Sequence, residues 1–331
     1  MIDTEFLLPR RHRFIQTVRE WFNERDFIEV ETPIAVTSPG MEIHLDAFSV
    51  ASRFAGKRYE TLYLHTSPEY HMKRALSSYS GPIYQLCHCF RDEPESILHR
   101  PEFIMLEWYR READYRVIMD DVDGLLGRLG EFLLDEPTLQ RPNGSSVDLA
   151  TGSERISVRE AMIRWANVDP WEHPSATELA AAAVREGVHA ESDWPWEDTF
   201  HLLLLERVES QLGRGRPTLL FDYPRSLAAL ARTRDDVAER FELYVDGVEL
   251  GNAFSELTDP TEQRARFQAE QLHRGSISKP VYPIDESLIS ALTHLPPSAG
   301  IAVGIDRLWL LFAEHWLGRP LTLSEVTLLS L

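Results

Sequence analysis

Apolar residues recur at helical spacing near the N-terminus and predict an amphipathic helix over roughly residues 9–25. The positions that mark its apolar face are Phe14, Val18, Trp21 and Phe22. Residues 28–31 then form an expected short strand, which Thr32-Pro33 ends because proline cannot donate to a strand ladder. The first segment of the chain is therefore expected to be a helix, a strand and a proline.

Two strand-like runs surround a polar loop further along the chain. Residues 83–90 and 103–110 are rich in apolar and aromatic side chains, whereas residues 91–102 between them are polar. Neighbouring strands joined by one such loop are typical of an antiparallel pair with a long hairpin connection.

The remaining elements follow from the same periodicities. Helices are expected through Met72 and Leu76 and near 117–132, 177–186, 197–212, 260–274, 285–294 and 306–316; strands are expected at 62–66, 218–222, 240–245, 249–257 and 300–304. Residues 137–152 are rich in turn formers, and Asp246-Gly247 is a strong two-residue hairpin turn. Mixed, mainly antiparallel strands with flanking helices indicate an α+β fold. We expect one domain over residues 1–331, with a helical insertion at about 154–212.

Composition and charge narrow the class of protein. The chain has 331 residues, 43% of them apolar and 26% charged, and no apolar run approaches the roughly 18 residues of a membrane span. Residues 1–5 do not resemble the start of a signal peptide. A formal net charge of −19 without a Lys/Arg-rich tract argues against a broad nucleic-acid-binding face. We expect a cytoplasmic protein that does not bind tRNA.

The two cysteines, Cys87 and Cys89, are separated by one residue within an expected strand. We expect their side chains to point to opposite faces, so that they cannot easily form a disulfide. Reduced, packed cysteines are the favoured interpretation, and a metal-binding pair is the alternative. Reduced cysteines agree with a cytoplasmic enzyme.

The most informative segment runs from Arg91 to Arg110. It places Arg91 and Glu93 after one strand and Phe103 at the start of the next. An ATP-dependent acyl-activating site needs a fixed cation for the α-phosphate, an acceptor for the adenine amine and an aromatic face beneath the base. The segment resembles motif 2 of the class II aminoacyl-tRNA synthetases, in its lysyl-type form.

Four other segments support the same resemblance by their order and spacing. Residues 9–33 resemble motif 1, which builds the dimer interface in that family, and residues 300–308 resemble motif 3. Residues 249–259 resemble the lysyl-type signature, and Thr66-Ser67-Pro68-Glu69-Tyr70 resembles the loop that faces the amino acid. The five segments cover most of residues 9–320.

The resemblance implies a role for each matched residue. For ATP, it implies catalytic contacts of Arg91 with the α-phosphate and Arg307 with the γ-phosphate, an adenine site at Glu93 and Phe103, and further contacts from Asp92, His99, Glu249, Leu250 and Gly304. The motif 3 glycines are expected to let the backbone approach ATP. For the amino acid, it implies a site made of Ser67, Pro68, Glu69, Tyr109, Asn252, Glu256 and Ala302.

The resemblance also implies that Glu249 and Glu256 bind Mg²⁺, a hard cation suited to carboxylate ligands. These glutamates are seven residues apart, so regular alternation would place them on opposite faces of a strand. A bulge at Gly251 or Ala253 could bring both into one site.

Within the synthetase-like proteins, the closest resemblance is to the elongation factor P (R)-β-lysine ligases. These stand-alone paralogues adenylate (R)-β-lysine and transfer it to a lysine ε-amine of elongation factor P. Full lysyl-tRNA synthetases carry an N-terminal anticodon-binding domain, for which we expect no room here. Ala302 stands where those synthetases have glycine and the β-lysine ligases have alanine, and one methyl group is worth about 1–3 kcal/mol of discrimination. Asp92, Arg100 and Ala253 depart from the usual pattern.

Two alternatives stay open at this point. One is activation of α-lysine or tRNA aminoacylation, and the other is a non-catalytic synthetase paralogue. The presence of the triphosphate and metal residues favours an enzyme, since a pure amino-acid binder does not need them. Motif 1 implies a C2 homodimer.

Overall fold

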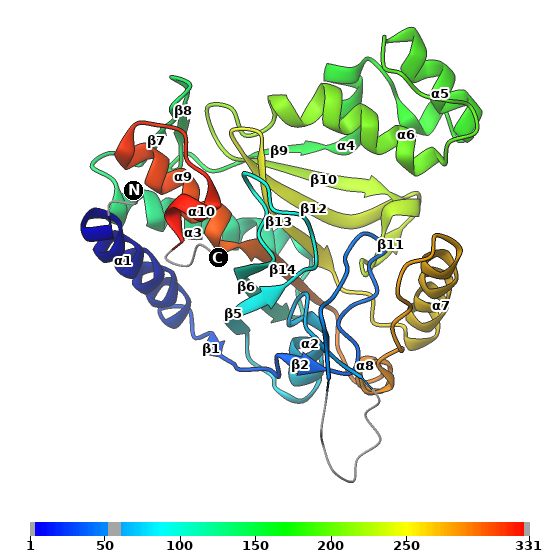
Figure 1. Ribbon diagram of the computed structural model, residues 1–331, viewed down its shortest axis with the longest axis horizontal. Coiled ribbons are helices and arrows are strands. Elements are labelled where there is room, and N and C mark those ends of the chain that lie inside the picture. The colour runs from blue at the N-terminus through cyan, green and yellow to red at the C-terminus, as the bar shows by residue number, and fades with distance from the viewer. Residues whose placement is uncertain (1–3, 52–60, 328–331) are drawn as a thin grey trace. The chain divides into compact units, whose positions relative to one another are not determined.

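The computed structural model describes residues 4–51 and 61–327, and the chain divides into two compact units (Figure 1). Unit 1 contains residues up to Asp114 and from Glu256 onward, and unit 2 contains Tyr115–Ser255. Within the described residues, no helix has both the length and the apolarity that a bilayer crossing requires. The single-domain organisation with an insertion at 154–212 stays a prediction.

Unit 1 contains the segments that resemble motifs 1, 2 and 3. Its elements are α1 (Thr4–Asn23), β1 (Ile28–Glu29), β2 (Ala35–Val36), β3 (Ser49–Val50), β4 (Leu62–Leu64), α2 (Glu69–Ser78), β5 (Ile83–Phe90), β6 (Glu102–Arg111), α7 (Pro260–Ser276), α8 (Glu286–Leu292), β14 (Ser298–Gly304), α9 (Ile305–Leu317) and α10 (Leu323–Val326).

The main strands of unit 1 lie in the order β1-β5-β6-β14. β1 is parallel to β5, and the other two pairings are antiparallel, which confirms the predicted pair joined by loop 91–102. Glu107 on β6 lies directly opposite Gln85 on one side and Ala302 on the other. Since directly opposed residues share a sheet face, this register places Glu107 and Ala302 side by side.

Helices α1 and α9 lie side by side in Figure 1, and aromatic side chains join them. Phe14 contacts Trp309 with ring centroids 5.6 Å apart, and Phe22 stacks on Tyr84 of β5 at 4.4 Å. Buried Asp306 in the first turn of α9 accepts a hydrogen bond from the Ile104 backbone at 2.8 Å. These contacts fix the three motif segments of unit 1 against one core.

The cysteine prediction was wrong in one respect. Cys87 and Cys89 share one face of β5, because residues two apart on a strand point the same way. Their sulfur atoms lie 3.9 Å apart, and both are free thiols.

Unit 2 contains α3 and a second set of strands and helices. Its elements are α3 (Tyr115–Leu133), β7 (Thr138–Gln140), β8 (Ser146–Asp148), β9 (Glu154–Ser157), α4 (Val158–Ala161), the π-helix Met162–Ala166, the 3₁₀ turn Pro170–Glu172, α5 (Ala176–Arg185), α6 (Trp196–Leu203), the π-helix Leu204–Val208, the 3₁₀ turn Glu209–Gln211, β10 (Thr218–Pro224), the 3₁₀ turn Arg225–Leu227, β11 (Thr233–Arg234), β12 (Val237–Val245) and β13 (Val248–Ser255).

Strands β12 and β13 form the predicted hairpin. Asp246 and Gly247 both have positive φ angles, 50° and 76°, as a two-residue type I′ turn requires. Glu249 pairs with Tyr244 and Gly251 with Leu243, so Leu250 is an extra residue in the register. A bulge is therefore present in this segment, at Leu250 rather than at Gly251 or Ala253. It changes the face on which Glu249 lies.

Two parts of unit 2 were not predicted. Residues 137–152 contain the β7–β8 hairpin, and the segment 154–212 opens with β9, which pairs parallel to β10. These strands are too short for alternation to identify them. Helices α4, α5 and α6, which follow β9, lie close together in Figure 1. Their buried apolar side chains belong to one cluster.

Candidate functional site

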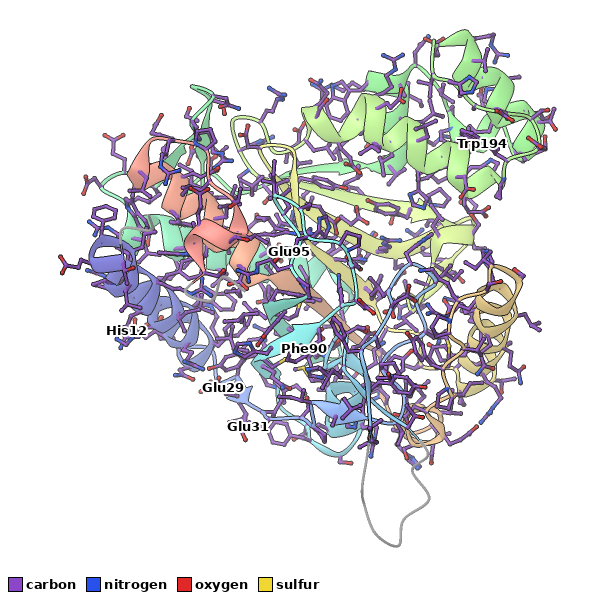
Figure 2. All side chains as sticks on the ribbon, viewed as in Figure 1. His12, Glu29, Glu31, Phe90, Glu95 and Trp194 are labelled. Atoms are coloured by element: carbon purple, nitrogen blue, oxygen red, sulfur yellow. The ribbon has the colours of Figure 1, made fainter. Side chains whose placement is uncertain are left out.

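Arg91 directly follows β5, whose last residue, Phe90, is labelled in Figure 2 together with Glu95 of the next loop. The backbone N–H of Arg91 donates to Pro101 at 2.9 Å and closes the base of the loop. The guanidinium carbon lies 5.0 Å from the centroid of the Phe103 ring. The Nε atom is buried and has no hydrogen-bond partner among the described residues. A half-buried cation with one buried, unsatisfied donor atom fits an anionic ligand such as a phosphate.

Arg307 joins the same loop to the start of α9. Its Nε donates to the Leu98 carbonyl at 3.1 Å, and its Nη2 lies 2.9 Å from His99 Nε2. Burial and the nearby Arg307 charge lower the pKa of His99, which favours the neutral ring that can accept from Arg307. Asp92 is exposed, and its backbone donates to Asp46 at 2.8 Å. The predicted ATP residues of unit 1 thus surround one loop.

Glu107 is a fully buried carboxylate in the middle of β6. Ser67 donates to one of its oxygens at 2.5 Å, and Tyr109 donates to the other at 2.9 Å. Burial raises the pKa of Glu107 well above its usual value, and the charge of Glu69 adds to this effect. The side chain is held in place by its partners, but no cation balances it in these contacts.

Lys73 lies between two other buried carboxylates. Its Nζ is 2.5 Å from both Glu69 Oε1 and Glu256 Oε2. Burial acts to lower the pKa of Lys73, but Glu256 and Glu69 more than offset it and leave the pKa raised. Burial raises the pKa of Glu256 to about 7, although Lys73 opposes this shift. Glu69 and Glu256 therefore share one lysine, whereas Glu107 has hydroxyl partners only, so an ammonium-bearing ligand would supply the cation that Glu107 lacks.

Two small residues of β14 shape the surroundings of Glu107. Ala302 lies directly opposite it, and Gly300 lies opposite Tyr109. A Cβ at Gly300 would come within 2.2 Å of the Tyr109 ring. The absence of a side chain at Gly300 makes room for the Tyr109 ring. The sequence predicted a different role for the motif 3 glycines, namely that they let the backbone approach ATP.

In unit 2, the predicted residues lie on the bulged strand β13. Asn252 accepts a hydrogen bond from Arg240 Nε at 3.1 Å and lies opposite Glu242. Glu249 is half-buried, Leu250 is buried, and the bulge gives Glu249 the same face as Glu242.

Glu242 is the centre of a polar network on that face. It accepts hydrogen bonds from Tyr223 at 2.5 Å, from Tyr244 at 2.7 Å and from Arg240. Burial and the Glu242 charge raise the pKa of both tyrosines well above the usual value. The phenols therefore stay protonated and act as donors at all ordinary pH values.

The predicted site residues divide between the units. Unit 1 holds Ser67, Pro68, Glu69, Arg91, Asp92, Glu93, His99, Phe103, Tyr109, Glu256, Ala302, Gly304 and Arg307, and unit 2 holds Glu249, Leu250 and Asn252. Glu107, Lys73 and Glu242 were missed. Each had a signal in the sequence: Glu107 falls on the same strand face as Phe103, Met105 and Tyr109, Lys73 is four residues after Glu69, and Glu242 interrupts an apolar strand.

Comparison with known proteins agrees with this geometry. A family model described as tRNA synthetases class II (D, K and N) matches residues 4–316. A protein named elongation factor P–(R)-beta-lysine ligase from Hamiltonella defensa is 39% identical over 313 residues, which cover 92% of this chain and 90% of that protein. Proteins of the same name from Edwardsiella ictaluri and Photorhabdus laumondii are each 40% identical with the same coverage.

Proposed function

Because this chain belongs to the class II tRNA synthetases of the D, K and N group, we propose that it is an ATP-dependent ligase acting on (R)-β-lysine and elongation factor P. It adenylates the amino acid and transfers it to a lysine ε-amine of the factor. The observation that carries the choice of substrate is the group of buried carboxylates around Lys73, with Ala302 beside Glu107.

ATP is held by the loop that follows β5. Arg91 contacts the α-phosphate, Phe103 stacks on the adenine, Glu93 accepts from the adenine amine, and Arg307 contacts the γ-phosphate. The Nε atom of Arg91 has no hydrogen-bond partner among the described residues, so it is available to donate to the α-phosphate. Asp92, His99 and Gly304 complete the part of the proposed site that unit 1 supplies, and the family motif assigns Leu250 of unit 2 an ATP contact as well.

In the first step, a carboxylate oxygen of β-lysine attacks the α-phosphorus, and the bond to pyrophosphate breaks. The substrate carboxylate is itself the nucleophile, so no nucleophile of the protein is needed. The positive charge of Arg91 stabilises the negative charge that develops on the α-phosphate. In the second step, the deprotonated lysine amine of the acceptor attacks the carbonyl carbon. An amide bond forms, and AMP leaves.

The carboxylate group of unit 1 recognises the two amines of the substrate. Glu107, with Tyr109 and Ser67, receives one ammonium group, and Glu69 receives the other. A bound cation makes ionised Glu107 favourable despite its burial. Pro68, Glu256 and Ala302 complete the substrate site of unit 1, and the family motif assigns Asn252 of unit 2 a contact with the same substrate.

Glu249 would hold Mg²⁺. The face it shares with Glu242 offers carboxylate oxygens, which suit this hard cation. Bound there, Mg²⁺ would neutralise charge on the triphosphate. Glu256 was also predicted as a metal ligand, but its contact with Lys73 favours its role toward the substrate.

The ligase is further proposed to be a cytoplasmic homodimer that does not use tRNA. Ile28 belongs to the segment resembling motif 1, and Leu8 and Ile34 directly flank that segment; Leu8, Ile28 and Ile34 are exposed by 46%, 49% and 44%. Exposed apolar side chains of this kind favour burial against a second copy. Replacing Ile28 by Lys should shift the sedimentation coefficient from that of a dimer to that of a monomer.

The experiment that tests the function is ATP–pyrophosphate exchange with (R)-β-lysine, L-α-lysine or no amino acid. We expect exchange that depends on (R)-β-lysine and is lost in Arg307→Ala. A preference for α-lysine would support the lysyl-tRNA synthetase-like alternative instead. Absence of exchange with both, with amino-acid affinity retained in Arg307→Ala, would identify a non-catalytic binder.

A further inference from the structure

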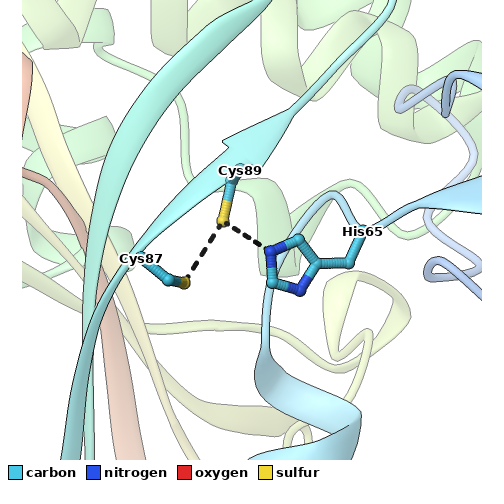
Figure 3. Close-up of side chains that lie close together, drawn as sticks. All are labelled: His65, Cys87 and Cys89. Atoms are coloured by element: carbon cyan, nitrogen blue, oxygen red, sulfur yellow. Dashed lines mark hydrogen bonds between the residues drawn. The ribbon is translucent and has the colours of Figure 1, made fainter. Parts of the chain in front are cut away.

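Unit 1 contains a cluster of soft ligands that the proposed ligase reaction does not use. Cys87 Sγ lies 3.9 Å from Cys89 Sγ, and Cys89 Sγ lies 4.0 Å from His65 Nε2 (Figure 3). One ligand atom from each of the three residues falls within 4.8 Å of the others. His65 and Cys89 are buried, and Cys87 is half-buried.

The fold brings these side chains together from two segments. Cys87 and Cys89 lie two residues apart on β5 and therefore point the same way. His65 follows β4, and its carbonyl accepts a hydrogen bond from the Phe90 backbone at 3.1 Å. This bond holds His65 beside the end of β5, independently of any ligand.

The arrangement suits a metal better than a disulfide. Two residues of extended strand separate the Cα atoms by about 6.7 Å, at the upper end of the range that a disulfide tolerates. Tetrahedral zinc with Zn–S bonds of about 2.3 Å places two thiolate sulfurs about 3.8 Å apart. The observed 3.9 Å is close to this separation.

We propose that His65, Cys87 and Cys89 bind a thiophilic d¹⁰ cation, of which Zn²⁺ is the representative, with one coordination position left for an outside ligand. Two thiolates and an imidazole are typical ligands of this cation class. Binding forms two metal–sulfur bonds and one metal–nitrogen bond, and each thiol releases one proton to solvent.

His65 can supply its nitrogen without losing its proton. Its Nε2 lies 2.7 Å from the His88 carbonyl, whereas its Nδ1 is buried without a hydrogen-bond partner among the described residues. A change of tautomer moves the proton to Nδ1 and frees Nε2 for the metal. This change breaks the hydrogen bond to His88, and the Nε2 lone pair must turn away from the His88 carbonyl toward the metal, because two acceptors repel each other at this distance.

The electrostatics favour one thiolate before any metal binds. The hydrogen bond from Cys89, followed by the contact with His65, lowers the pKa of Cys87 to about 6, although burial opposes it. Burial raises the pKa of Cys89. Cys87 is also the more exposed of the two cysteines, so an incoming cation reaches its sulfur first.

The test uses the full chain, whose only two cysteines make every thiol signal specific to this cluster. Titration with Co²⁺ should produce a sulfur-to-cobalt charge-transfer absorption at one equivalent, and Zn²⁺ should abolish it by competition. Zn²⁺ should also protect both thiols from Ellman's reagent. Thiols that react equally with and without Zn²⁺ would overturn the proposal.

Variants separate ligation by His65 from binding by the thiols alone. His65→Gln should weaken Zn²⁺ binding by about tenfold or more. His88→Gln is the matched control, because His88 lies on the other face of β5. This variant should bind Zn²⁺ with the affinity of the wild type. Equal affinities of the two variants would exclude the three-ligand site. Mg²⁺ in place of Zn²⁺ should leave thiol reactivity unchanged.

Discussion

Unit 1 and unit 2 each bury a group of charges, but the two groups are balanced differently. In unit 1, the acid pocket consists of Glu69, Glu107 and Glu256 with Lys73, and the lysine contacts only the first and third carboxylates. Glu107 has two hydroxyl donors instead of a cation.

In unit 2, the Glu242 network consists of Glu242, Arg240, Tyr223 and Tyr244. Here one carboxylate receives an arginine and two phenols. The network is neutral by itself, since Arg240 matches Glu242, and its donors fix the carboxylate before any ligand arrives. The acid pocket instead has three carboxyl groups and one lysine, so it lacks the matched cation that Arg240 provides in unit 2. The comparison indicates that unit 1 is arranged to recognise cationic groups, whereas unit 2 is arranged to orient a carboxylate.

The largest effect is expected when each group loses its cation. Lys73→Met leaves two buried carboxylates without their partner and should lower the free energy of unfolding by about 3–5 kcal/mol. Arg240→Met should cost less, about 1–3 kcal/mol, because both tyrosines still donate to Glu242. Urea unfolding of both variants measures the difference. Equal losses would contradict the distinction between the two groups.

A second pair of variants tests recognition of the substrate. Glu107→Gln keeps the shape of the side chain but removes its charge. For (R)-β-lysine, kcat/KM should therefore fall roughly 10- to 150-fold, which corresponds to a loss of about 1.5–3 kcal/mol of transition-state stabilisation. Steady-state pyrophosphate exchange gives this value. Glu242→Gln should keep the KM for the amino acid within about twofold of the wild-type value. It should instead raise the Mg²⁺ concentration at which pyrophosphate exchange is half-maximal. A similar rise in the KM for the amino acid in both variants would contradict the assignment of substrate recognition to Glu107 and of Mg²⁺ binding to the Glu242 face.

A third prediction concerns the methyl group beside Glu107. Ala302→Gly should raise activation of α-lysine relative to (R)-β-lysine by about 1–3 kcal/mol, because it enlarges the pocket by one methyl. Ala299→Gly is the control, since Ala299 lies on the other face of β14, opposite Arg110. The ratio of the two kcat/KM values is the measurement. An unchanged ratio in Ala302→Gly would show that the methyl does not select the substrate.

The smallest effect is a pH dependence of stability that originates in the acid pocket. The pKa of Glu256 rises from its ordinary 4.5 to about 7 on folding, so the folded state binds more protons than the unfolded state between these values. Stability should therefore fall as pH rises through this window, by at most about 1.4 kcal/mol per pH unit. Glu256→Gln should flatten the slope, measured by unfolding at several pH values. A slope equal to that of the wild type would assign the effect to other groups.

The elements with strong periodicity could be predicted from the sequence. β5, β6 and the loop between them were recognised because each strand is long enough to show its apolar character, and α9 because its apolar stripe continues for several turns. The short strands β7, β8 and β9 depend on pairing partners that local pattern does not reveal.

The site was predictable only where a motif exists. Arg91, Phe103 and Arg307 were identified by resemblance, and their roles stay predictions. The pairing of Lys73 with Glu256 joins residues 183 positions apart, and no local pattern indicates it. The prediction for the cysteines failed for a different reason. The strand was predicted correctly, but residues two apart on a strand lie on the same face, and the prediction placed Cys87 and Cys89 on opposite faces.

The close packing of Gly300 against Tyr109 has a consequence for how this sequence can change over time. Any side chain at position 300 collides with the tyrosine ring, and the tyrosine hydroxyl in turn holds Glu107. A drift to alanine at position 300 thus requires a smaller residue at position 109, which leaves the glutamate with one hydroxyl donor fewer. The three positions are therefore expected to covary as a unit among descendants of this chain.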